Sequence, residues 1–208
     1  MKLPEKTVER LSEYRRTLLE CLTKGKTHIY SHEMARLHNN TAVQVRRDLM
    51  LIGYSSMKKK GYDAKELVDV IGKIIDYKHG LNVAVVGMGN LGRAVTTYFI
   101  GKRPKLNIVA TFDVDSNKTN RVISGINCYH VKELKEKIKT GNISIAIIAS
   151  PPDTAADITE TLVNAGIKGI LNFTTTPINV PENVFLEEYD MITSIEKVAY
   201  FVKDQVKS

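Results

Sequence analysis

The sequence predicts an α/β protein with two domains and a terminal helix. Up to residue 80, apolar residues recur at helical spacing. Beyond it, apolar runs of strand length alternate with helical stretches, and a glycine-rich segment, Gly87–Gly92, follows the first of these runs. We therefore expect an N-terminal winged helix-turn-helix over residues 1–79, a C-terminal Rossmann-like parallel-sheet domain over residues 80–190, and a terminal helix over residues 191–208.

The first 80 residues are expected to form helices around a small core. Ser31 and Thr41 can each cap a helix, the turn Asn39-Asn40 separates the two, and Gly53 ends the second. Two short helices joined in this way are typical of a helix-turn-helix. The expected elements are helices over Val8–Leu22, His32–His38 and Ala42–Ile52, a hairpin wing over Tyr54–Tyr62, and a helix over Ala64–Lys78 that His79-Gly80 closes.

The second half is expected to be a succession of parallel strands and helices. Its apolar runs are rich in Val and Ile, as in strands that are buried on both faces. We expect strands at Asn82–Val86, Ile108–Phe112, Ile143–Ala149 and Gly169–Asn172, and helices at Asn90–Ile100, Val131–Thr140, Ala155–Ala165 and Ile192–Lys207. After Asn172 only a loop and this last amphipathic helix are expected, so its apolar stripe has no strand to pack against.

The distribution of charge points to DNA as a partner of the first domain. Residues 1–80 hold 16 Lys and Arg against 10 Asp and Glu, which is most of the net charge of +7. Such a surface favours phosphate contacts, although a basic domain can also simply be soluble.

The third expected helix has one apolar face, which would pack against the core. Its opposite face carries side chains that can contact bases in the major groove. The alternative interpretation is that this face is only exposed to solvent. The predicted DNA-binding residues are Ser31, Val43, Gln44, Arg46 and Arg47, with Lys58, Lys59 and Lys60 on the wing.

The glycine-rich segment has the G-x-G-x-x-G spacing of a dinucleotide fingerprint, placed between a strand and a helix. Gly87 permits the tight turn, Gly89 lets a pyrophosphate approach the backbone, and Gly92 lets the helix pack against the strand. Asp113 ends the second strand 26 residues after Gly87, where an acid receives the ribose hydroxyls. Because Asp113 would repel a 2′-phosphate, we expect NAD(H) rather than NADP(H). The alternative is a glycine-rich turn that binds no nucleotide.

Other classes of function are poorly supported by the sequence. No segment has the length and apolar character of a signal peptide or a membrane span, so a cytoplasmic protein is expected. Cys21 and Cys128 lack a CxxC or Cys-His context and are expected to be reduced. The five histidines include no H-E-x-x-H, so no metal site is expected. No residue stands out as an acid or base beside a nicotinamide, which argues against an enzyme.

With these parts in this order, the chain resembles the Rex family of redox-sensing transcriptional repressors along nearly its whole length. The resemblance is carried by Arg10-Leu-Ser-Glu-Tyr14-Arg-Arg16, Gln44-Val-Arg-Arg-Asp48-Leu49, Gly87-Met-Gly-Asn-Leu-Gly92 with Tyr98, Ser150-Pro-Pro152, Ala165-Gly-Ile-Lys-Gly-Ile170-Leu-Asn-Phe173 and Asp190-Met191. Departures from the family pattern are Arg15, where an aromatic is common, Arg47, Lys58–Lys60 and Thr174-Thr-Thr176.

The resemblance implies a homodimer whose C-terminal helices are domain-swapped, and a coupling of cofactor to DNA through Arg16, Tyr98 and Asp190. It implies a repressor that binds an A/T-rich inverted-repeat operator when NADH is low and releases it when NADH binds. The implied cofactor residues are Gly87, Met88, Gly89, Asn90, Leu91, Gly92, Tyr98, Asp113, Val114, Ser150, Pro151, Pro152 and Asp190. An NAD-dependent dehydrogenase with a basic extension and a CoA-binding domain fused to a helix-turn-helix are the rival interpretations.

Overall fold

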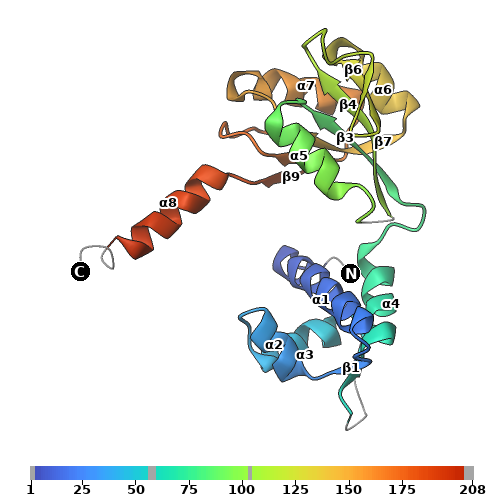
Figure 1. Ribbon diagram of the computed structural model, residues 1–208, viewed down its shortest axis with the longest axis vertical. Helices are drawn as coiled ribbons and strands as arrows, with labels where there is room; N and C mark the ends of the chain where they lie inside the picture. The colour runs from blue at the N-terminus through green and yellow to red at the C-terminus, as the bar shows by residue number, and fades with distance from the viewer. Residues whose placement is uncertain (1–2, 56–59, 103–104, 204–208) are drawn as a thin grey trace. The chain divides into compact units, whose positions relative to one another are not determined.

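The computed structural model describes residues 3–55, 60–102 and 105–203, and it divides into two compact units, residues 1–78 and 79–208 (Figure 1). Each unit has its own buried apolar cluster. Lys58 and Lys59 of the expected wing lie outside the described residues. Cys21 and Cys128 are both free.

The first unit is a bundle of four helices with a two-stranded sheet. Leu11 and Leu18 of the first helix, Leu49 of the third and Ile71 of the fourth are fully buried in one core. This arrangement follows from the spacing of the apolar residues, which lie on one side of each helix. The elements are α1 (Glu5–Thr23), β1 (His28–Ile29), α2 (Ser31–Leu37), α3 (Ala42–Leu51), β2 (Tyr62–Asp63) and α4 (Ala64–Ile75).

Three local predictions in this unit were wrong. Ser31 does not cap α2 but is its first residue; the cap position is Tyr30, whose N–H donates to the Glu33 carboxylate at 2.8 Å. The helix α4 ends at Ile75 rather than Lys78. Among the described residues of 54–62 only Tyr62 is in a strand, and β2 pairs antiparallel with β1, which precedes α2. A strand two residues long is too short for periodicity to reveal. The expected cap at Thr41 is confirmed, since its hydroxyl accepts the Gln44 N–H.

A buried carboxylate joins α1 to α3. Asp48 is fully buried, and Arg10 donates to both of its oxygens, from Nε and from one terminal nitrogen, at 2.7 Å each. The Tyr14 hydroxyl and the Gln44 side-chain amide also donate to it. Burial by itself would raise the pKa of the Asp48 carboxyl, but these hydrogen bonds outweigh burial and lower that pKa. Asp48 is therefore ionised and satisfied inside the first unit.

The second unit is a seven-stranded sheet between layers of helix. Its strand order is β5-β6-β4-β3-β7-β8-β9, and every pairing is parallel except that of β5 with β6. The strands are β3 (Leu81–Val86), β4 (Leu106–Asp113), β5 (Arg121–Ile123), β6 (Ile126–His130), β7 (Ile143–Ile148), β8 (Gly169–Asn172) and β9 (Phe185–Glu188). The helices are α5 (Asn90–Phe99), α6 (Leu134–Thr140), α7 (Ala155–Ala165) and α8 (Met191–Val202), with short 3₁₀ turns at Val131–Glu133 and Pro152–Thr154.

Successive side chains of the central strand β3 point to opposite faces of the sheet and so contribute to the core on each face. Ala84 and Val86 belong to the core with α6 and α7, whereas Val83 and Val85 belong to the core with α5. This is the period of two that a strand buried on both faces requires. Figure 1 shows α5 on one face and α6 and α7 on the other.

The sequence missed the strands β5, β6 and β9. The first two form a hairpin around Ser124 and Gly125, both at positive φ, which is the geometry of a type I′ turn. The Ser-Gly pair between two β-branched stretches was a usable signal for it. The strand β9 adds a parallel edge next to β8, so the expectation of only a loop and a helix after Asn172 was wrong. Its four residues carry no clear alternation.

The terminal helix α8 is left without a core. Asp190 caps it by accepting the N–H groups of Ile192 and Thr193 at 2.8 and 3.3 Å. The structure describes the whole of Met191–Val202, and none of these residues is buried. The sequence predicted no strand that could cover the apolar stripe of this helix, and the stripe is exposed in the structure as well.

Replacing Arg10 with Met is expected to destabilise the first unit by about 2 kcal/mol, because Asp48 would keep a buried charge without its ionic partner. Urea unfolding followed by circular dichroism measures this. Since the folded-state pKa of Asp48 is lowered, the loss should be complete above the unfolded pKa of about 3.9 and shrink as the pH falls below it.

The matched control is Lys6→Met, on the same helix, where an exposed pair with Glu9 is broken instead. Its effect should stay under about 0.5 kcal/mol. Equal losses in the two variants would contradict the role given to the Arg10–Asp48 pair.

Candidate nucleotide pocket and nucleic-acid interface

A pocket of about 900 Å³ lies where β3, β4 and β7 end. After β3 the chain passes through α5 to β4, which is the neighbour of β3 on one side, whereas β7 is its neighbour on the other side. The strand order therefore changes direction at β3. Open parallel sheets bind ligands at such a switch point. Its lining residues are Val86, Gly87, Gly89, Asn90, Leu91, Asp113, Val114, Asp115, Lys118, Val131, Lys132, Leu134, Ala149, Ser150, Pro151, Thr154, Asp157, Ile158 and Thr161.

The three glycines of the fingerprint meet different surroundings. Gly87 has φ +96°, and a Cβ there would lie 2.6 Å from the Ala149 carbonyl oxygen. A Cβ on Gly92 would overlap the carbonyl oxygen of Gly87. A Cβ on Gly89 would meet no atom within 4 Å. The packing of the protein therefore requires glycine at Gly87 and Gly92, whereas Gly89, which lines the pocket, has open space where a Cβ would lie.

The Asp113 carboxylate is held in place by three donors. It accepts the Met88 N–H at 2.8 Å, the Asp115 N–H at 2.9 Å and the Lys118 ammonium at 2.9 Å. Burial alone would raise the pKa of Asp113, but these bonds outweigh burial and lower it. Asp113 is thus an ionised, nearly buried acid that also borders the pocket.

The structure brings most, but not all, of the expected cofactor residues to this pocket. Gly87, Gly89, Asn90, Leu91, Asp113, Val114, Ser150 and Pro151 line it. Met88 and Gly92 are buried beneath the turn, and Pro152 begins a 3₁₀ turn beside it. Tyr98 and Asp190 are not among its lining residues.

Sequence reasoning missed the contribution of α7 and of Lys118. Asp157, Ile158 and Thr161 of α7 line the pocket. Asp157 and Thr161 lie four residues apart, on one face of that helix. This spacing indicates pocket residues only once the helix is known to lie beside the pocket. Lys118 carries no motif in the sequence.

The expected DNA-reading face of α3 is displayed in the first unit. Val43, Arg46 and Arg47 are exposed, and one terminal nitrogen of Arg46 donates to the Ser31 hydroxyl of α2 at 3.2 Å. Gln44 is only partly exposed, and its side-chain NH₂ donates to Asp48 at 2.9 Å. Its amide is therefore oriented by the buried network rather than free. Lys60 is exposed in the loop that leads to β2.

Comparison with known proteins places the chain in a family. Models described as a CoA binding domain and as a putative DNA-binding protein N-terminus match residues 78–176 and 2–49. The redox-sensing transcriptional repressor Rex of Carboxydothermus hydrogenoformans is 37% identical over 97% of this chain and 97% of its own length. The chain belongs to the Rex family of redox-sensing transcriptional repressors. The Rex of Leuconostoc citreum is 36% identical over 97% of this chain and 93% of its own length.

Solved structures agree with this assignment. RSP, a Rex-family repressor, has a TM-score of 0.84 with 29% identity, over 99% of this chain and 96% of its own. RSP in complex with β-NAD⁺ and operator DNA has a TM-score of 0.89 with 29% identity, over 99% and 94%. The family and fold class expected from the sequence are therefore confirmed.

The residues that the Rex resemblance assigns to coupling have these surroundings. Arg16 is exposed on α1, and Tyr98 is exposed on α5 with the Lys102 ammonium 3.4 Å from its ring centroid. Asp190 caps α8. The neighbouring Arg15, one of the departures from the family pattern, is buried, and its guanidinium pairs with Asp76 at 2.7 Å.

Among the described residues, no group of three His, Cys, Asp or Glu side chains is arranged to hold a metal ion. Nor is any helix in that part of the chain long and apolar enough to cross a membrane.

Gly92→Ala is expected to destabilise the second unit by about 3 kcal/mol, because the new methyl group meets the Gly87 carbonyl, which cannot move without shifting β3. Thermal unfolding of Gly92→Ala and Gly89→Ala tests this. Gly89→Ala should cost less than about 1 kcal/mol, since its only loss is a preferred helix-cap residue. An equal loss in both variants would contradict the packing role of Gly92.

Proposed function

We propose that this chain performs the family's redox sensing by binding NAD(H) in the pocket at the end of β3 and operator DNA on α3. The observation that carries the proposal is the turn Gly87–Gly92. In this turn, packing against neighbouring backbone requires glycine at Gly87 and Gly92, whereas Gly89 lines the pocket and has open space where a side chain would lie. A solved relative, RSP, binds β-NADH in one structure and β-NAD⁺ with operator DNA in another.

The pocket suits the parts of a dinucleotide. The pyrophosphate would lie against Gly89 and the first turn of α5, whose leading N–H groups have no partner within the helix. The ribose hydroxyls of the adenosine would meet Asp113, which lines the pocket at the end of β4. Ser150 and Pro151 follow β7 and border the part where the nicotinamide end would lie. Met88, Gly92 and Pro152 would support these residues from behind.

The sign of the response follows from the charge of the nicotinamide. The oxidised ring is cationic and the reduced ring neutral, and an apolar pocket favours the neutral one. The cofactor can shift the repressor between conformations only by its difference in affinity for them. We infer that NADH stabilises the conformation that does not bind DNA, with Arg16, Tyr98 and Asp190 coupling the pocket to the first domain and an Arg16–Asp190 contact as the latch.

The proposed DNA contacts divide by chemistry. Val43, Gln44 and Arg47 of α3 would meet base edges in the major groove, whereas Arg46, Ser31 and the lysines 58–60 would meet the phosphates. The hydrogen bond to Asp48 leaves the Gln44 carbonyl oxygen to accept from a base. This division fits an A/T-rich operator, because adenine offers a donor that an amide oxygen accepts.

In a homodimer, the apolar side chains of α8 could be buried against a second copy of the chain. Large apolar side chains on it are exposed, among them Ile195 at 68%, Val198 at 61% and Phe201 at 70%. Phe185, the first residue of β9, and Tyr189, which follows that strand, are also exposed. Apolar surfaces of this kind mark protein interfaces. We infer that the C-terminal segment, residues 191–208, which contains α8, is exchanged between two copies, and that two α3 helices then read the halves of an inverted repeat.

We infer a regulator rather than an enzyme, acting in the cytoplasm where bacterial operators are. The members to which it is related are transcription regulators. A dehydrogenase would turn over NADH with some small substrate. A CoA-binding protein, which the matching model for residues 78–176 keeps as the alternative, would be stabilised more by CoA than by NADH in a thermal-shift assay.

Fluorescence anisotropy with an A/T-rich inverted-repeat duplex at fixed salt tests the central proposal. NADH should release the DNA at a concentration about tenfold or more below that at which NAD⁺ does, which corresponds to about 1.4 kcal/mol of differential binding. Tight DNA binding indifferent to both cofactors would overturn it.

The same titration on the variant Asp190→Asn tests whether the charge of Asp190 couples NADH binding to DNA release. Asn caps a helix nearly as well as Asp, so the variant keeps α8 while losing the charge. NADH should then release DNA less readily. An unchanged response would remove Asp190 from the coupling.

Ile195→Glu is expected to disrupt the dimer, because it places a charge in the middle of the apolar stripe of α8. Light scattering after size exclusion should give twice 23.3 kDa for the wild type and a mass shifted toward 23.3 kDa for the variant. Lys197→Glu, on the same helix, is the matched control and should remain dimeric. A monomeric wild type would contradict the exchanged helix.

A further inference from the structure

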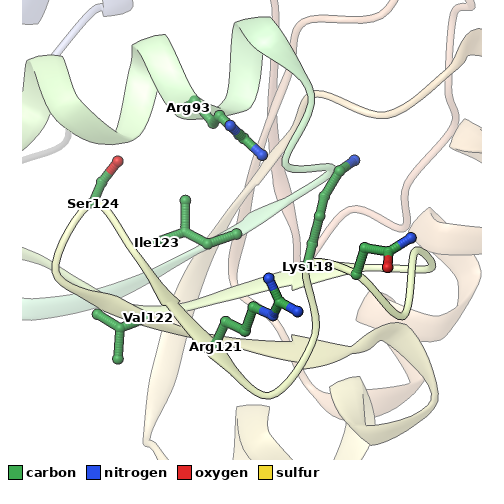
Figure 2. Close-up of a pocket in the computed structure, with 7 residues that line it drawn as sticks. Arg93, Lys118, Arg121, Val122, Ile123 and Ser124 are labelled. Atoms are coloured by element: carbon green, nitrogen blue, oxygen red, sulfur yellow. The ribbon is translucent and has the colours of Figure 1, made fainter.

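A second, smaller pocket of about 400 Å³ lies beside the nucleotide pocket (Figure 2). It is formed by α5, the loop after β4, and β5. Its lining residues are Arg93, Asn117, Lys118, Arg121, Val122, Ile123 and Ser124.

The pocket is strongly basic. Arg93, Lys118 and Arg121 come from three different segments, and Figure 2 shows their charged ends around one space. Among the described residues that line the pocket, none is acidic. Lys118 is paired with Asp113 at 2.9 Å, but no described carboxylate forms an ion pair with Arg93 or Arg121, and an anion between these side chains relieves their mutual repulsion.

The two arginines keep most of their donors available. Arg93 uses Nε to donate to the Met88 carbonyl at 3.3 Å, which fixes the guanidinium and leaves its terminal nitrogens for the pocket. The backbone of Arg121 pairs with β6, but within the described part of the chain its side chain makes no hydrogen bond or ion pair. Guanidinium groups match the oxygens of a phosphate in pairs. The side chains of Asn117 and Ser124 add neutral polar groups at the rim.

Lys118 connects this basic pocket to the nucleotide pocket, because it lines both. Its ammonium donates to Asp113, whose carboxylate also accepts two backbone N–H groups. The negative charge of Asp113 is therefore largely compensated before any ligand arrives. The repulsion of a 2′-phosphate that Asp113 alone would cause is correspondingly smaller in this chain.

We propose that Arg93, Lys118 and Arg121 form a binding site for a phosphomonoester next to the adenosine end of the nucleotide pocket. Two sources share this chemistry: the 2′-phosphate of NADP(H) held in the adjacent pocket, and free inorganic phosphate. The first source rests on the proposed binding of a dinucleotide there, whereas the second does not. In the first case the chain binds NADPH as well as NADH.

The test compares wild type with Arg121→Gln, a residue outside the nucleotide pocket. Calorimetry at low salt gives the Kd for NADPH and NADH, and ³¹P line broadening follows binding of inorganic phosphate. Loss of one charge-assisted contact should weaken NADPH binding by about tenfold or more and NADH by less than twofold. Lys139→Gln, an exposed lysine of α6, is the control of equal charge change and should alter neither.

Each outcome decides between the sources or against the site. Selective weakening of NADPH assigns the site to the 2′-phosphate. If NADPH binding is insensitive but Arg121→Gln abolishes the broadening of inorganic phosphate, the source is the free ion. If neither changes, the proposal is overturned. A wild type that binds no NADH at all contradicts the proposed cofactor instead, and the phosphate experiment still decides the basic pocket.

Discussion

The close approach of Gly92 to the carbonyl of Gly87 is the constraint on which the second unit depends. It brings the start of α5 against the end of β3, and the Met88 N–H between them is fixed by Asp113 of β4. One tight turn thereby joins two strands and a helix and leaves Gly89 open toward the pocket. The pocket proposed for the nucleotide is thus a direct result of how the sheet and its first helix are packed.

The first unit depends on a different interaction, the buried Asp48 carboxylate. Its partners Arg10 and Tyr14 come from α1 and Gln44 from α3. A charge that is fully buried must be satisfied, so the network sets the position of α3 against α1. The same network orients Gln44, which faces the proposed operator. The carboxylate that stabilises the first unit therefore also orients a residue of the proposed DNA interface.

Charge links the proposed cofactor site to its surroundings in a similar way. Asp113 is both a predicted ribose ligand and the ionic partner of Lys118, and Lys118 belongs to the basic pocket as well. An acid at the end of the second strand is commonly taken to select NAD(H). In the proposed site its selectivity would depend also on the cations around it, which the acid alone does not reveal.

Sequence reasoning alone predicted the family, the fold class, the helices α3, α5 and α7 to within a residue or two, and the pocket residues Gly87, Gly89, Asn90 and Leu91. It could do so because periodicity and glycine spacing are local properties. Tertiary structure decided what depends on contacts between distant residues. The pairing of β1 with β2, the edge strand β9, the ion pair of Arg15 with Asp76, and the convergence of Arg93, Lys118 and Arg121 bring together residues up to 61 positions apart. No local pattern records such contacts, since they form only when the sheet and helices pack.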